Sequence, residues 1–404
     1  MNNTTNHTLT VAILLLFYAA VEILSVKSFY VLFPIFLYLV LRNGTSPIVK
    51  KSVLFFVIPS ILAFAIGLFR FEPYDVFKDL TYFFIPISGL AFGNVFAKKY
   101  GAPTVLNSLE TAGKIICLIF LSVVFIKFGP EIIYEARDIR DTEEGGLGID
   151  TGFFPVVTAG IILYRFLFFR YEYHMRDIVW LFVCILAIIA SGSRTYFISF
   201  IIVTLCIIIS SFRRHFVRFM IITPLLMLAV AGIMSTNEAF VDSLKESTAE
   251  ISIENTEDLN ENENYRGYEA KMALLFVSES ALEYQIAGNG AGVAVDMGNY
   301  APVRRFVPIT HNGYIYILLK FGLAGMAVIL AFGIYILQYI VKWHPCKLRD
   351  KQLKTLSIGC ILTLFAANYV ICGIFNVLSY PLMIIIGCTL SYIYQYKKRC
   401  AKSR

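Results

Sequence analysis

Long apolar runs recur along nearly the whole chain of 404 residues, and they constrain its fold more than any other feature. Runs such as 8–26, 52–69 and 217–234 carry almost no charge over about 15–22 residues, the length that crosses the hydrocarbon layer of a membrane as an α-helix. The runs are continuously apolar rather than alternating, which indicates helices and excludes barrel strands. The hydrophobic share of 58% also exceeds that of soluble domains, roughly 45–50%. The sequence therefore predicts an all-α, polytopic membrane protein.

The apolar runs divide into about twelve expected transmembrane helices. The first follows an N-terminus without a basic segment or an obvious cleavage site, which favours a retained helix over a signal peptide. The expected spans are 8–26, 28–41, 52–69, 79–97, 105–127, 152–169, 178–190, 195–211, 217–234, 313–341, 355–373 and 376–395.

The charges between these spans predict an orientation. If the N-terminus is cytoplasmic, every segment on that side is basic, as in "SFRRHFVR" and the tail "YKKRCAKSR". Two segments on the other side, 70–79 and 129–150, are acidic. The positive-inside rule therefore places both termini in the cytoplasm. The expected organisation is an N-terminal bundle of about nine helices (1–234), a large external loop (235–312), and C-terminal helices with a basic tail (313–404).

Several classes of function are excluded by what the sequence lacks. The net charge of +7 is spread over short loops without a nucleic-acid-binding motif, so no nucleic-acid partner is expected. The eight cysteines avoid the long polar loops and form no CxxC, which argues against a disulfide framework or a zinc site. There is no P-loop, no HExxH and no external Asp-x-Asp pair, so we expect neither a metal nor a cofactor.

Histidine is scarce on the expected external face. Of five histidines, only His311 lies outside, where the large loop meets the span at 313–341. It is therefore the candidate for acid–base chemistry near neutral pH. The alternative is that the "THNGY" segment only caps the helix, a role that Thr310 or Asn312 could also fill.

Arginine is the second theme of the external face. Some external arginines have acidic neighbours that explain them as solvated ion pairs. Four are different: Arg194 in "SGSRT", which has no acid within several residues, Arg266, which follows an acidic run and begins an expected helix, and Arg304 and Arg305, which lie between two prolines. The guanidinium fork fits phosphate oxygens, so several such side chains in one pocket would bind a diphosphate without a metal. The alternative for each is interaction with lipid headgroups.

A glycine-rich turn, "AGNGAG", interrupts the large loop. Gly288 and Gly290 would allow a tight turn in which backbone N–H groups approach an anion. The segment lacks the strand–turn–helix context of a dinucleotide fingerprint.

The order of these elements resembles the O-antigen ligase and polymerase superfamily, over roughly residues 178–326. A large external loop joins a Ser-x-Ser-Arg element to a His-Asn element that precedes a helix. The residues that carry the resemblance are Ser191, Ser193, Arg194, Arg266, Gly288, Gly290, His311, Asn312, Gly322 and Gly325. Lys320 departs from the pattern, since many members carry an acid there.

The resemblance implies an inverting, metal-independent glycosyltransferase with a helical fold related to the GT-C class. It implies a place in the bacterial inner membrane with the large loop periplasmic. The substrate would be an undecaprenyl-diphosphate-linked glycan, and the further partners would be the lipid bilayer and a chain-length regulator. His311 would accept a proton, Arg194 and Arg266 would stabilise the diphosphate, and the remaining binding residues would be Ser191, Ser193, Gly288, Gly290, Asn312, Arg304 and Arg305.

Within this superfamily we favour a polymerase of O-antigen or capsule repeat units, because polymerases are diverse and often carry weak motifs such as these. The first alternative is a ligase that transfers the glycan to lipid A core, because both reactions use the same residues. A transporter of the same lipid-linked glycan is the alternative from another class. Transporters usually place their charges near the midplane of the membrane, whereas these charges lie at its outer boundary.

Overall fold

The computed structural model describes residues 3–24, 44–130, 150–169, 175–211, 265–298 and 305–402, with single positions between them. The expected span 217–234 and almost all of 28–41 lie outside the described residues. Every other expected span coincides with a helix. These helices are α1 (Asn3–Leu24), α3 (Pro47–Leu68), α4 (Pro73–Tyr100), α5 (Ala102–Phe128), α7 (Phe154–Phe168), α8 (Met175–Ala190), α9 (Arg194–Ser211), α14 (Gly313–Val341), α15 (Leu348–Val370) and α16 (Tyr380–Lys402).

Within the described part, six helices are long and apolar enough to cross a membrane: α3, α4, α5, α14, α15 and the C-terminal helix. A membrane imposes this architecture, since a helix satisfies its own backbone hydrogen bonds where no water is present. The all-α, polytopic class predicted from the sequence is therefore confirmed for this part of the chain.

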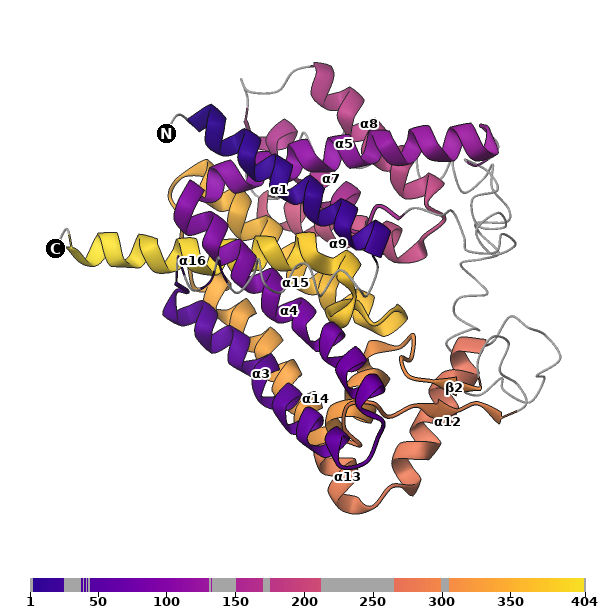
Figure 1. Cartoon of the computed structure of the whole chain (residues 1–404). Coiled ribbons are helices and arrows are strands. Elements are labelled where there is room, and N and C mark those ends of the chain that lie inside the picture. Colours follow the sequence, from indigo (N-terminus) through magenta and orange to yellow (C-terminus); the bar gives the residue numbers. More distant parts are fainter. Residues whose placement is uncertain are drawn as a thin grey trace.

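Helices α4 and α16 form the centre of the bundle. Glycines allow their backbones to touch: a Cβ at Gly93 would collide with the carbonyl of Ile384, and one at Gly387 with that of Leu90. Small residues at such crossings let the helix backbones pack closely. This packing matters in lipid, because no hydrophobic effect drives one membrane helix against another. The other described helices surround this pair (Figure 1).

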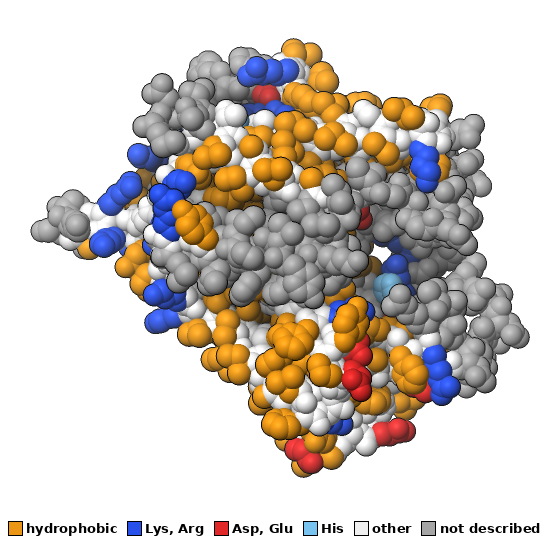
Figure 2. Space-filling model, viewed as in Figure 1, with side chains coloured by type: hydrophobic (Ala, Val, Ile, Leu, Met, Phe, Trp, Pro, Cys, Tyr) orange, Lys and Arg blue, Asp and Glu red, His pale blue; other side chains and the backbone are white. Residues whose placement is uncertain are grey.

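The two ends of the bundle differ in content and in charge. Both termini lie at one end, whereas α12 (Tyr265–Glu279), α13 (Leu282–Ala287) and the strands β1 (Val295–Asp296) and β2 (Phe306–Val307) lie at the other (Figure 1). On the face shown in Figure 2, lysine and arginine side chains gather over the end with the termini, and several acidic side chains lie over the opposite end. Charge asymmetry of this kind is what the positive-inside rule uses to assign an orientation.

Helix α14 is interrupted at Gly322, whose φ of 66° and ψ of −170° are not helical. The turn at Gly288 fills the interruption, because a Cβ on Gly322 would collide with the backbone of Ile286 and Gly288. A small apolar cluster joins the first part of α14 to α12 and to the segment around β1; it includes Ala273, Val293, Val295, Ile315 and Leu319. The elements outside the bundle are thereby fixed to the start of one membrane helix.

Candidate active site

A buried carboxylate holds His311 at the start of α14. Glu269 on α12 accepts a hydrogen bond of 2.5 Å from the backbone N–H of His311. Its other oxygen lies 2.9 Å from Nδ1 of the His311 ring. The Glu269 side chain is 1% exposed, but that of His311 is 46% exposed. One edge of the ring is therefore fixed inside the protein while the side chain as a whole remains open to solvent.

This contact sets the tautomer of the ring. A carboxylate only accepts hydrogen bonds, so Nδ1 of His311 carries the hydrogen and donates it to Glu269. In the neutral ring the lone pair then lies on Nε2. A carboxylate–histidine pair of this kind orients the ring and stabilises its protonated form, as in the serine hydrolase triad.

The alternative role for His311, helix capping, belongs to its neighbour. The side-chain oxygen of Asn312 accepts from the backbone N–H groups of Tyr314 and Ile315 at 3.0 and 3.2 Å, so Asn312 is the N-cap of α14. The hydroxyl of Thr310 donates to the carbonyl of Asn312. Helix capping therefore does not account for the imidazole of His311.

Arg266 lies on the same helix as Glu269, three residues earlier. Residues at this spacing share a face of a helix. The Arg266 side chain is half-buried. Helix α12 therefore carries a cation next to the carboxylate that holds His311.

Arg194 is the first residue of α9 and is only 6% exposed. It follows a turn in which Gly192 has a φ of 60°. Ser191 stabilises this turn: its hydroxyl donates to the carbonyl of Ile188 and accepts from the N–H of Ser193. A helix N-terminus is a positive dipole end, so Arg194 adds a largely buried cation to a helix end of the kind that binds anions.

Contacts connect the Arg194 turn to the start of α14. Tyr196, one turn from the start of α9, donates to Asp150 at 2.7 Å. The adjacent Phe153 donates its N–H to Leu378, in the connection between α15 and α16. At the other side of this connection, Asn368 accepts from Ile374 and packs against Gly313. Arg194 and His311 therefore lie at the same end of the bundle.

Among the described residues, no group of three or more His, Cys, Asp or Glu side chains could hold a metal ion.

Residues 179–330 match the family model described as O-antigen ligase. The match begins in α8, ends in α14, and includes Arg194, Arg266, Glu269 and His311. It confirms the resemblance to the O-antigen ligase and polymerase superfamily. No curated protein matches the chain.

The glycine turn lies within the matched residues, 179–330, and its backbone is hydrogen-bonded to the rest of the protein. The N–H groups of Asn289 and Gly290 donate to the carbonyls of Leu319 and Lys320, and that of Ala291 donates to Ala63. Gly288 and Gly290 have φ angles of 90° and 93°, which disfavour any other residue. The turn thus attaches the segment between α13 and β1 to α3 and α14. Its N–H groups donate to protein acceptors rather than point at a ligand.

Arg305, which also lies within the matched residues 179–330, forms a surface ion pair. Its Nε and Nη2 atoms each lie 2.9 Å from an oxygen of Asp296, and its side chain is 65% exposed. The hydrogen bond from Arg305 lowers the pKa of the Asp296 carboxyl. This bidentate pair occupies the face of Arg305 that would bind phosphate. Arg304 lies outside the described residues.

A buried ion pair connects the matched residues 179–330 to α4, which lies outside the match. Nζ of Lys320 lies 2.5 Å from Asp79, and both side chains are at most 1% exposed. Lys320 also donates to Val293, and Asp79 accepts from Gly292. The residue that departs from the family pattern therefore fixes the glycine segment to the bundle.

Glu269 and Asp79 are the two residues that sequence reasoning missed. Glu269 lies in "YRGYEAKM", one helical turn after Arg266, so helical spacing alone places it beside a chosen arginine. Asp79 and Lys320 both lie near the outer ends of expected spans. Because a lone charge in a membrane helix needs a partner, the opposite signs were a signal that these two residues pair.

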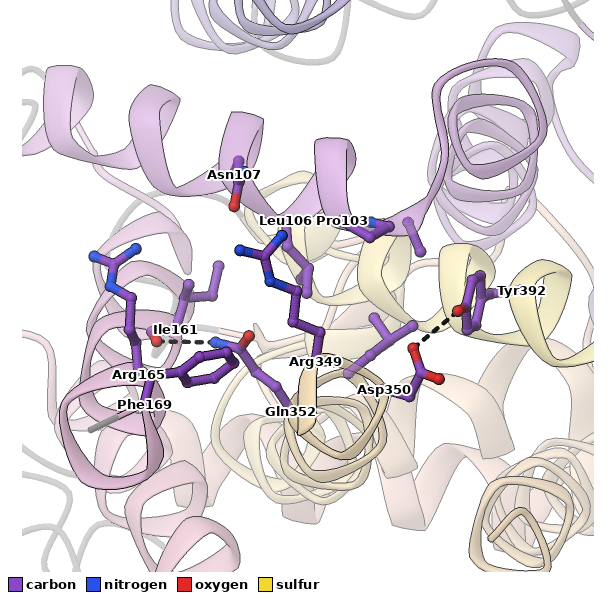
Figure 3. Close-up of a pocket in the computed structure, with 12 residues that line it drawn as sticks. Pro103, Leu106, Asn107, Ile161, Arg165, Phe169, Arg349, Asp350, Gln352 and Tyr392 are labelled. Atoms are coloured by element: carbon purple, nitrogen blue, oxygen red, sulfur yellow. Dashed lines mark hydrogen bonds between the residues drawn. The ribbon is translucent and has the colours of Figure 1, made fainter. Parts of the chain in front are cut away.

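A second charged cluster lies at the end with the termini. Arg165 on α7 binds Glu110 through two bonds of 2.8 and 2.9 Å and also contacts Asp177. Beside it is a cavity of about 50 Å³, between α5, α7, α15 and α16. Figure 3 shows the guanidinium groups of Arg165 and Arg349 and the amide of Asn107 around this space. The cavity is small, and it lies at the end opposite His311.

Proposed function

We propose that the chain is a membrane glycosyltransferase that uses a lipid-diphosphate-linked glycan as its donor. The observation that carries this proposal is the histidine ring fixed by a buried carboxylate, Glu269 to His311, at the external end of the bundle. This arrangement suits proton abstraction, and two arginines at the same end suit an anionic leaving group. The fold would be related to the GT-C class.

The proposed reaction is an inverting displacement at the anomeric carbon of the donor glycan. An acceptor hydroxyl attacks C1 from the side opposite the diphosphate, and Nε2 of His311 takes its proton. The C1–O bond breaks with its electron pair going to the lipid diphosphate. Glu269 stabilises the imidazolium that forms, as a carboxylate does in other histidine bases.

The arginines act on the departing diphosphate. Negative charge grows on it as the bond breaks, and Arg194, with the helix terminus that it occupies, meets this charge in a largely buried setting. Arg266 contributes from α12. Loss of one such donor typically costs about 10²–10³ in rate. Arg305 is not assigned to this set, because Asp296 occupies it.

The favoured acceptor is a second repeat unit on the same carrier, which makes the chain a polymerase of O-antigen or capsule units. The alternative is a ligase that passes the glycan to lipid A core, and the matching family model, described as O-antigen ligase, is compatible with both reactions. Gel analysis of surface polysaccharide after gene deletion separates these two. Loss of a polymerase leaves a single repeat unit on the acceptor, whereas loss of a ligase leaves the acceptor bare.

The orientation belongs to the same proposal. The chain lies in the bacterial inner membrane with both termini cytoplasmic, the loop 235–312 periplasmic, and a chain-length regulator as a further partner.

A His311→Ala variant that stays in the membrane should make no product in this setting. Normal product from that variant would exclude His311 as the base. If the chain were a transporter, deletion of its gene would instead trap unpolymerised units on the cytoplasmic side.

A further inference from the structure

A groove between α7, α9 and α15 has the shape and the charge of a phospholipid site. Its volume is about 730 Å³, within the range of roughly 300–1,000 Å³ that is typical of small-molecule sites. It lies at the end of the bundle that carries the termini, away from His311. The groove is therefore separate from the proposed glycan site.

The character of the lining changes along α15 from charged to apolar. Leu348 lies at the start of α15, Lys351, Lys354 and Thr355 follow, and the residues further along the helix, Ile358 and Leu362, are apolar. From Lys351 onward these positions recur every three or four residues, so they follow one face of the helix for about 16 Å. A phospholipid has the same sequence of parts, a charged headgroup followed by an acyl chain.

The other walls continue this pattern. His344 lies at the charged end, in the connection that leads to α15. Tyr164 and Phe168 of α7 and Ile209 of α9 supply apolar surface. Among the described residues that line the groove, none is an aspartate or glutamate. The charge therefore favours an anionic occupant.

Lys354 has a partly structural role in this wall. Its Nζ donates to the carbonyls of Val341 and Trp343 at 2.8 and 2.6 Å, which holds the end of α14 against α15. Its charge still adds to the potential at the mouth of the groove. Lys351 and His344 are the side chains placed to meet a headgroup.

We propose that this groove binds one anionic phospholipid of the surrounding bilayer. Lys351 and His344 contact the phosphate, and an acyl chain lies along Tyr164, Ile209, Ile358 and Leu362. Basic pockets between transmembrane helices are a recurrent way of binding such headgroups.

Native mass spectrometry of the full-length chain in a neutral detergent tests this proposal. Phosphatidylglycerol and phosphatidylcholine with identical acyl chains are added in parallel. We expect phosphatidylglycerol to bind at clearly lower concentration. One lysine near an anionic headgroup contributes about fivefold in affinity. Lys351→Ala should therefore weaken the binding of phosphatidylglycerol by that factor and leave the binding of phosphatidylcholine unchanged.

Two matched changes sharpen the test. Lys347→Ala removes an exposed lysine at the same end that does not line the groove, and it should keep the wild-type preference. Ile358→Trp fills the apolar part of the groove and should weaken the binding of both lipids. Equal binding of the two lipids by the wild type, or an unchanged preference in Lys351→Ala, would overturn the proposal. Displacement of the lipid by inorganic phosphate would also overturn it, since it would indicate a site for the headgroup alone.

Discussion

One carboxylate, that of Glu269, binds both the backbone N–H and the ring Nδ1 of His311. The two residues are 42 positions apart in sequence, on α12 and at the start of α14. The pair therefore forms only when α12 is packed against the start of α14. The orientation of the proposed base consequently depends on the packing of α12.

The first prediction concerns the charge of Glu269. Glu269→Gln keeps the size of the side chain but cannot stabilise a protonated ring, so glycosyl transfer should fall by about 10²–10⁴, the usual contribution of general base catalysis. The rate of product formation from a lipid-linked donor measures this. Glu279→Gln, on the exposed end of the same helix, is the control. Equal activity of the two variants would show that Glu269 has no part in proton transfer.

The second prediction concerns Arg194. Arg194→Ala should lower the transfer rate by about 10²–10³, because a donor to the leaving group is lost. Arg194→Lys keeps the charge but not the fork, so it should recover only part of the rate. Arg176→Ala, an exposed arginine at the start of α8, provides the matched control. Full activity of Arg194→Ala would remove this residue from the diphosphate site.

The third prediction concerns pH and the pair between Asp296 and Arg305. The pKa of Asp296 lies below its usual value of 3.8, so the pair stabilises the folded chain above that pH. This contribution is lost as the pH falls through the lowered pKa. Arg305→Ala should therefore return the pKa of Asp296 towards 3.8, which an NMR titration of the carboxyl measures. An unchanged titration would mean that Arg305 does not act on Asp296 in solution.

The fourth prediction concerns the glycine turn. Alanine at a left-handed position costs about 1–2 kcal/mol. Gly298→Ala has open space around the new Cβ and should cost only that amount, whereas Gly288→Ala would also collide with the backbone of Lys320 and Phe321. Thermal unfolding in detergent should therefore show a larger loss for Gly288→Ala. Equal losses would contradict the packing of this turn on α14.

The fifth prediction concerns the buried pair of Asp79 and Lys320. Lys320→Met leaves a carboxylate buried without its cation, which typically costs about 3–5 kcal/mol. Adding Asp79→Leu removes the stranded charge, so the double variant should be more stable than Lys320→Met alone. Denaturation midpoints of the two variants decide this. A double variant less stable than the single one would show that the bonds of Asp79 to the loop outweigh the charge.

The membrane helices were predictable because the lipid leaves a chain few choices. An apolar run of sufficient length becomes a helix, and the described helices lie where those runs are. The interruption at Gly322 was not predictable in this way, because glycine is common in unbroken membrane helices. It depends on the turn at Gly288, which lies far away in sequence and fits only after folding.

The candidate site was predictable in its parts but not in its pairings. Scarcity identified His311, and isolation from acids identified Arg194. The partner of His311 was hidden, since Glu269 is one of many carboxylates in an acidic loop. The partner of Arg305 was hidden for a related reason: Asp296 reaches it across two short strands whose register the sequence does not reveal.

The break at Gly322 divides α14 into two segments with different neighbours. The segment that begins beside His311 packs on α12 and the glycine turn, and Tyr316, Ile317 and Phe321 also join it to the main core. The longer segment beyond Gly322 packs in that core alone. One continuous stretch of chain can thereby pack in two directions, with the histidine at the start of the first.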